Sequence, residues 1–145
     1  MKKKLSLNEE IFDIIDEFTF FDDWSDKYQH LIDQGKKIER IEENLKIEKN
    51  KIKGCQSNVY FFSKTDDNGI IYFSGESDAA IVQGLIAILF RVFSGRNPNE
   101  ILSSNADFLN KIGLDKHLSP TRKNGLSHII NAIYVEAKKQ NVKQT

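Results

Sequence analysis

The sequence contains only one cysteine, Cys55, among its 145 residues. No intramolecular disulfide can form, so we expect a reducing compartment and predict a cytoplasmic location. One thiol and three scattered histidines also fall short of the ligand sets of ordinary zinc and iron–sulfur sites. The composition therefore predicts no metal site.

An excess of charge and a long hydrophobic run are also missing. The 21 Lys and Arg residues balance 21 Asp and Glu residues, which argues against a nucleic-acid backbone as the main partner. The most hydrophobic run, residues 81–93, includes Gln83 and Arg91 and is shorter than the ~20 residues of a membrane-spanning helix. Polar residues follow the lysines at positions 2–4 too closely for a secretory signal. We expect no nucleic-acid partner, no membrane association and no export.

The chain has only two prolines and shows neither an internal repeat nor a low-complexity linker. Hydrophobic residues make up 39% and charged residues 29% of the sequence, as in ordinary globular proteins. A chain of this length usually forms one domain. We predict that residues 1–145 form a single domain with a buried core.

The first third of the sequence carries two helix signals. Ser6 and Glu9 have the spacing of a capping box and precede an apolar stripe, which predicts a first helix. Asp22 or Asp23 can cap a second helix, and Gly35 is expected to end it.

The middle of the sequence predicts a hairpin. Residues 59–62 and 70–73 are rich in β-favouring side chains, and residues 64–69 between them are rich in turn formers. A third strand is possible near residues 47–52. The apolar segment 79–93 predicts a central buried helix, and shorter helices and a long last helix follow it. The class is α+β, with a small antiparallel sheet of about three strands packed against several helices.

Cys55 is the strongest nucleophile in the sequence, and it lies between a glycine and the predicted hairpin. Gly54 permits backbone conformations closed to other residues, while Gln56, Ser57 and Asn58 are small polar residues able to hold a loop by hydrogen bonds. By residue type alone, a single intracellular cysteine is more often a small buried hydrophobe. The residues leave a displayed thiol and a structural thiol both open.

A cysteine hydrolase would also need a histidine base close to the thiol. His30 falls on the second helix and His128 lies beside the apolar stripe of the last helix, positions typical of surface or packing histidines. His117, just before the last helix, remains the strongest candidate of the three. None has the sequence context of a catalytic base.

Three blocks of the sequence resemble the SufE family: Gly-Cys-Gln-Ser-Asn-Val-Tyr at 54–60, Gly-Glu-Ser-Asp-Ala-Ala-Ile-Val-Gln-Gly-Leu-Ile-Ala at 75–87, and His-Leu-Ser-Pro-Thr-Arg-Lys-Asn-Gly-Leu at 117–126. The resemblance covers nearly the whole chain. It implies an α+β fold similar to that of IscU-like iron–sulfur scaffold proteins. Tyr60 and Glu76 depart from the family pattern, which often has tryptophan and aspartate there.

The resemblance implies a sulfur acceptor. Cys55 would take persulfide sulfur from a pyridoxal-phosphate cysteine desulfurase of the SufS or CsdA type, stimulate that enzyme, and pass the sulfur to a scaffold for iron–sulfur cluster assembly. The pyridoxal phosphate belongs to the partner, so we expect no cofactor and no independent turnover here. The alternative is a noncatalytic desulfurase-binding or regulatory module in which Cys55 is structural.

Other residues in the matched blocks are expected to support the acceptor loop or to contact the partner. Asp78 matches an acidic position near that loop, yet it fits equally well in the first turn of the central helix. Arg122 can bond to loop carbonyls or meet an acidic partner surface, and it fits nearly as well as an ordinary arginine at the start of the last helix. The same roles are predicted for Gly54, Gln56, Ser57 and His117.

We further expect the loop to hold Cys55 against apolar surface, because a persulfide is easily lost to small thiols. Burial would raise the pKa of the thiol, whereas Arg122 or a helix amino terminus would lower it. The sequence does not rank these effects.

Overall fold

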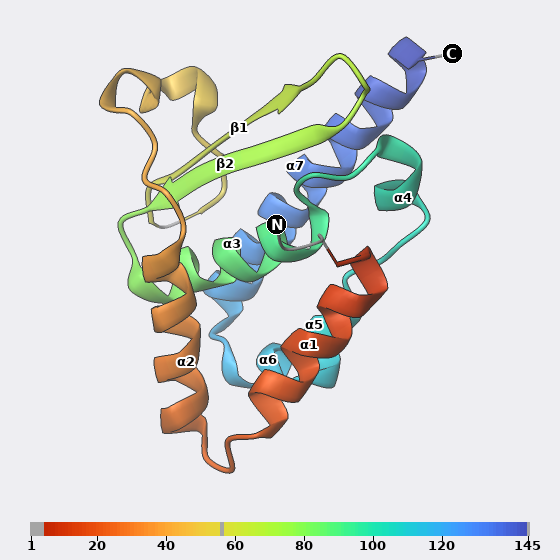
Figure 1. Cartoon of the computed structure of the whole chain (residues 1–145). Coiled ribbons are helices and arrows are strands. Elements are labelled where there is room, and N and C mark those ends of the chain that lie inside the picture. The colour runs from red at the N-terminus through yellow and green to blue at the C-terminus, as the bar shows by residue number, and fades with distance from the viewer. Residues whose placement is uncertain (1–4, 56, 145) are drawn as a thin grey trace.

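The computed structural model describes residues 5–55 and 57–144. It confirms the α+β class, with an antiparallel hairpin lying across a layer of helices (Figure 1). The elements in chain order are α1 (Leu7–Thr19), α2 (Trp24–Lys37), the 3₁₀ turns η1 (Glu43–Leu45) and η2 (Glu48–Asn50), β1 (Val59–Thr65), β2 (Ile71–Ser77), α3 (Ala80–Phe93), α4 (Pro98–Leu102), α5 (Phe108–Lys111), α6 (Leu114–His117) and α7 (Pro120–Gln144).

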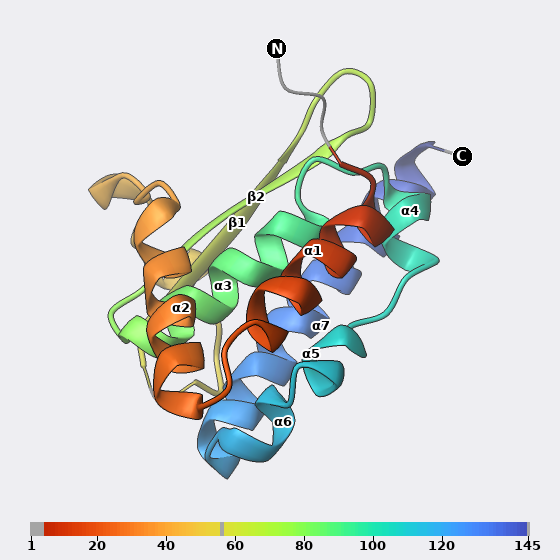
Figure 2. The same ribbon diagram turned by 60° about the horizontal axis from the view of Figure 1, so that its bottom comes forward.

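Helix α3 forms the centre of the core. Most of its side chains are buried, because it is apolar on nearly every face and contacts α1, α2, α7 and β2. Figure 2 shows α3 running between α1 and α7, with α2 crossing one end. Phe90 of α3 packs beneath the hairpin with Phe61 and Phe73. None of the helices in the described ranges is both long enough and apolar enough to cross a membrane.

Helices α2 and α3 approach each other closely through two glycines. A Cβ atom on Gly84 would lie 2.2 Å from the carbonyl oxygen of Leu31, and a Cβ on Gly35 would lie 2.8 Å from the backbone nitrogen of Gly84. Only glycine fits at both positions without a shift of backbone. The prediction that Gly35 ends the second helix was therefore wrong: α2 continues to Lys37, and Gly35 serves helix packing instead.

The predicted caps of the first two helices are present. Ser6 Oγ accepts from the Glu9 backbone N–H at 3.1 Å, and Glu9 Oε1 accepts from the Ser6 N–H at 2.9 Å. Asp23, one of two candidates, caps α2 by accepting from the Asp26 N–H at 2.8 Å. These bonds satisfy amide groups that have no partner within the helix itself.

The sheet has two strands in the described part of the chain, where the sequence predicted about three. β1 and β2 pair from Val59 opposite Ser77 to Thr65 opposite Ile71. The segment expected to form a third strand instead contains the turn η2, and Asn50 donates its side-chain N–H to the carbonyl of Leu45 at 2.9 Å. The charged residues of this segment form a turn at the surface. Of the strand pairing expected there, the described residues show a single bridge, between residues 51 and 60.

Glu76 links the irregular segment between α2 and β1 to the hairpin. Its carboxylate accepts from the Ile41 N–H at 3.1 Å and forms ion pairs with Lys46 at 2.8 Å and Arg40 at 3.3 Å. Burial acts to raise the pKa of Glu76, but these partners outweigh it and hold the pKa below its ordinary value. The segment before Cys55 is thus anchored by one buried carboxylate.

Arg91 joins the three helices around the core. It donates from Nε to Glu10 Oε1 at 2.9 Å and from both terminal nitrogens to Glu17 at 2.7 and 2.9 Å, all on α1. It also donates to the Gln34 side chain of α2 at 2.8 Å. The hydrogen bond from Arg91 holds the pKa of Glu17 below its ordinary value, against the opposing effect of burial.

We predict that Arg91→Ala lowers the free energy of unfolding by about 2 kcal/mol, because it leaves two partly buried carboxylates without their cation. Since the pKa of Glu17 is lowered in the fold, wild-type stability should fall as the pH drops below its ordinary value of 4.5. The variant should lose less stability over the same pH interval. Urea unfolding between neutral and acid pH measures both effects.

Arg40→Ala is the matched control, since Arg40 is exposed and pairs with a single carboxylate. We expect it to cost less than about 1 kcal/mol. Equal stabilities of the two variants would contradict the assigned role of Arg91.

Candidate functional site

The candidate site is built on the acceptor loop, defined as residues 53–58, which leads into β1. The base of the loop is closed where the Ile52 N–H donates to the Val59 carbonyl at 2.8 Å. Gly54 has a φ of +90°, a conformation that favours glycine, as its predicted role requires. Gln56 lies outside the described residues.

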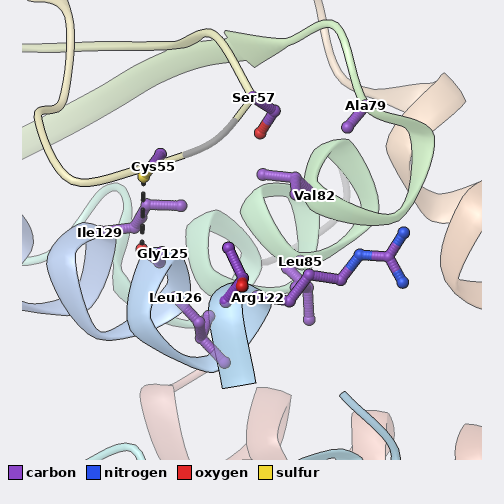
Figure 3. A pocket seen from close by; sticks show the side chains of 10 residues that line it. Cys55, Ser57, Ala79, Val82, Leu85, Arg122, Gly125, Leu126 and Ile129 are labelled. Carbon is purple, nitrogen blue, oxygen red and sulfur yellow. Dashed lines mark hydrogen bonds between the residues drawn. The ribbon is translucent and has the colours of Figure 1, made fainter. Parts of the chain in front are cut away.

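Cys55 is half-buried, and its sulfur points from the loop toward α7 (Figure 3). The thiol lies 3.7 Å from the Gly125 carbonyl, in the geometry of a weak S–H donor. Beside it lies a cavity of about 300 Å³. The other residues that line this cavity are Ser57, Ala79, Val82, Leu85, Thr121, Arg122, Gly125, Leu126 and Ile129.

Burial raises the pKa of the Cys55 thiol. Arg122, the cation that the sequence placed nearby, extends away from Cys55 along the cavity (Figure 3). Desolvation is thus the cause of the shift, and neither of the lowering effects considered from the sequence offsets it. A raised pKa disfavours the thiolate, which is the nucleophilic form.

Asp78 holds the far side of the acceptor loop. Its two carboxylate oxygens accept from the Asn58 backbone N–H at 3.1 Å and from the Asn58 side chain at 3.2 Å. The Asp78 N–H returns a bond to the Asn58 carbonyl at 3.3 Å. Asp78 precedes the Ala79 N-cap of α3, so the alternative of a first-turn helix acid is wrong. Close by, the Ser57 hydroxyl lies 3.5 Å from that of Ser77, and the role of Ser57 in supporting the loop stays a prediction.

Arg122 lies in the first turns of α7 and is exposed at the cavity. Among the described residues, no hydrogen bond joins its side chain to a carbonyl of the acceptor loop. Contact of Arg122 with a partner stays a prediction.

The histidines differ in their relation to the thiol. His117 ends α6, a short helix the sequence did not predict, and its ring stacks on Trp24 at 3.7 Å. It does not line the cavity, and its part in a partner contact stays a prediction. His30 bonds to Glu17 at 2.9 Å. His128 lies directly against Gly54, a contact that the sequence gave no signal for.

No group of three or more His, Cys, Asp or Glu side chains within residues 5–55 and 57–144 is placed to hold a metal ion. The only described hydrogen bond of the Cys55 sulfur goes to a backbone carbonyl.

Residues 12–137 match the family model described as "SufE: Fe-S metabolism associated domain". The chain belongs to the SufE family. Two curated relatives are each named an uncharacterized SufE-like protein. The one from Rhizobium etli is 41% identical over 129 residues, covering 86% of this chain and 87% of the relative. The one from Rhizobium meliloti is 41% identical over 128 residues, covering 86% and 91%.

A solved structure shares the fold of the chain. The solution structure of a hypothetical protein from Thermus thermophilus superimposes with a TM-score of 0.75 at 16% identity, covering 92% of this chain and 96% of the other. At this identity the likeness concerns the fold alone. Family membership places the protein in iron–sulfur metabolism.

We predict that Asp78→Ala raises the rate constant for alkylation of Cys55 about three- to tenfold, because both bonds to Asn58 are lost and the loop opens more often. Asp78→Asn keeps one acceptor oxygen and should give a smaller increase. Iodoacetamide labelling followed by intact-mass measurement gives the rate constants.

Asp66→Ala provides a matched control in the hairpin turn. Asp66 Oδ1 also accepts two backbone N–H bonds, from Asn68 and Ile70 at 2.9 Å each. The control removes the same number of bonds without touching the acceptor loop, so its labelling rate should equal that of the wild type. A rise as large as that of Asp78→Ala would contradict the assignment of Asp78 as the residue that holds the acceptor loop closed.

Proposed function

We propose that the protein accepts sulfur on Cys55 from a cysteine desulfurase and carries it as a persulfide toward iron–sulfur cluster assembly. The observation that carries the proposal is the half-buried Cys55 thiol, held by a loop over a largely apolar cavity. SufE family membership supports the same role.

The transfer step needs one thiolate and no cofactor on this chain. The Cys55 thiolate attacks the outer sulfur of a persulfide on the donor cysteine, a new S–S bond forms to Cys55, and the S–S bond of the donor breaks. The donor leaves as a thiolate, and the hydrogen of the persulfide remains on the transferred sulfur. No electrons enter or leave the pair, so no oxidant is required.

The cavity gives the carried sulfur a protected place. Its volume of about 300 Å³ exceeds the roughly 30 Å³ of one water molecule, so an added sulfur atom fits without displacing the lining. The side chains of Val82, Leu126 and Ile129 offer no hydrogen bonds to water. A persulfide stored there is shielded from small thiols, which would otherwise reduce it.

The raised pKa of Cys55 argues that docking activates the thiol. In the free protein, burial raises the pKa of the thiol and so lowers its tendency to ionise. Contact with a desulfurase that draws the loop outward would remove that desolvation and present Cys55 to the donor persulfide. The enzyme of the pair is the desulfurase with its pyridoxal phosphate, and this protein is its sulfur-transfer partner and stimulator. A scaffold protein is the recipient.

The decisive test incubates the protein with a pyridoxal-phosphate cysteine desulfurase and cysteine, and measures intact mass before and after reductant. The wild type should gain about one sulfur atom, ~32 Da, and lose it on reduction, as thiol–persulfide exchange requires. Cys55→Ser should gain nothing while keeping its fold and its binding to the enzyme.

The competing function is a desulfurase-binding module with a structural cysteine. It predicts undiminished stimulation of the desulfurase by Cys55→Ser and no mass gain on the wild type. Either result with a competent enzyme would replace the carrier proposal.

We predict that Arg122→Ala weakens binding to the desulfurase about three- to fivefold and reduces its salt dependence, as loss of a charge at the edge of an interface does. Because Arg122 makes no described bond to the loop, alkylation of Cys55 in the free variant should not change. Binding titrations at two salt concentrations measure the effect.

Lys123→Ala is the control, since Lys123 neighbours Arg122 in sequence but lines a different surface depression. Equal weakening by both variants would indicate a general charge effect and contradict a specific contact at Arg122.

A further inference from the structure

His128 of α7 lies directly under the turn that presents the acceptor cysteine. A Cβ atom placed on Gly54 would lie 2.5 Å from His128 Nε2, 2.7 Å from Cδ2 and 3.1 Å from Cε1. These three atoms form the outer end of the imidazole ring. The tip of His128 therefore occupies the side of Gly54 where any other residue would carry its side chain.

One helical turn earlier in α7, Gly125 makes a second contact with the acceptor loop. Gly125 and His128 are three residues apart, so they lie on the same face of α7. Gly125 offers its carbonyl to the Cys55 sulfur at 3.7 Å, while His128 meets the preceding residue, Gly54. One face of α7 thus contacts two consecutive residues of the acceptor loop.

Gly54 is the point at which the loop can most easily change direction. Its φ of +90° is open to glycine alone at little cost, so a glycine here has many other conformations available. The base of the loop is fixed at Ile52 and Val59, and its far side is fixed by Asp78. Among the described residues, His128 contacts Gly54 itself.

We propose that His128 is a positioning residue for the acceptor loop. Its ring tip supports the Gly54 turn from below and so holds the Cys55 sulfur against α7 and over the cavity. His128 acts on the thiol indirectly, through its contact with Gly54. It does not act as a base in the sulfur transfer. The proposal deepens the proposed function, because the support matters biologically only if Cys55 carries sulfur.

The first test compares the alkylation rate constant of Cys55 in three variants of the full chain. His128→Ala should react about fivefold faster than the wild type, because the unsupported turn opens more often. His128→Gln reaches the same position with an amide and should stay within about twofold of the wild type. Ser127→Ala, an exposed neighbour on another face of α7, should not change the rate.

Rescue by glutamine separates support of the turn from a general loss of stability. Thermal unfolding should be nearly the same for all three variants, since His128 is exposed and outside the core. A His128→Ala rate equal to that of the wild type, or a His128→Gln rate equal to that of His128→Ala, would overturn the proposal.

A double-mutant cycle tests the contact itself. Gly54→Ala alone places its Cβ against the imidazole and also strains the backbone, so Cys55 should be alkylated faster than in the wild type. In Gly54→Ala with His128→Ala, the clash is gone and only the strain remains. The combined increase should fall clearly below the product of the two single increases. A simple product would mean that the two residues act independently, which would overturn the proposal.

The loss of bound sulfur gives a functional readout. After loading by a desulfurase, persulfide on His128→Ala should be lost to glutathione about fivefold faster than persulfide on the wild type, as follows from more frequent loop opening. Persulfide lost equally fast from both proteins would overturn the positioning role. If the wild type accepts no sulfur at all, the proposed function fails. The alkylation rates would still show whether His128 holds the acceptor loop in place.

Discussion

Burial of most of α3 is the constraint on which the rest of the structure depends. The helix carries apolar side chains around its whole circumference, and an isolated helix of this kind would not be stable in water. It must be covered by α1, α2, α7 and the hairpin together. The glycines at 35 and 84 bring α2 close, and Arg91 ties α1 and α2 to the same helix.

The site arises where this cover is incomplete. Near the start of α3, Val82 and Leu85 line the cavity beside Cys55, together with Leu126 and Ile129 of α7. The acceptor loop closes over that opening and places Cys55 at its edge (Figure 3). The fold thereby places a largely apolar cavity next to its only thiol. The cavity is lined by core helices and the acceptor loop rather than by a separate binding segment.

The sequence predicted those parts of the fold that depend on local pattern. Capping residues, the hairpin and the buried helix follow from spacing and periodicity within a few residues. The prediction that Gly35 ends the second helix was wrong. In the sequence, a glycine that terminates a helix cannot be told from one that lets another backbone approach closely. The missing third strand has a similar cause: Ile47 and Ile52 favour a strand, but the turn η2 forms between them and Asn50 bonds back to the Leu45 carbonyl. Cys55 was found from its neighbours and from family resemblance, whereas its contact with His128 spans distant residues and leaves no local signal.

The contacts that hold the acceptor loop differ in kind from those that hold the core. Arg91 makes several short charge-assisted bonds in a partly buried network, while the loop depends on exposed bonds to Asp78, a weak thiol contact at 3.7 Å and the tip of His128. Exposed bonds of this kind open at far smaller free-energy cost than the core. The proposed carrier role would need that difference, since the thiol would have to be closed during transport and open at the donor. A loop fixed as firmly as the helices would protect the sulfur and never receive it.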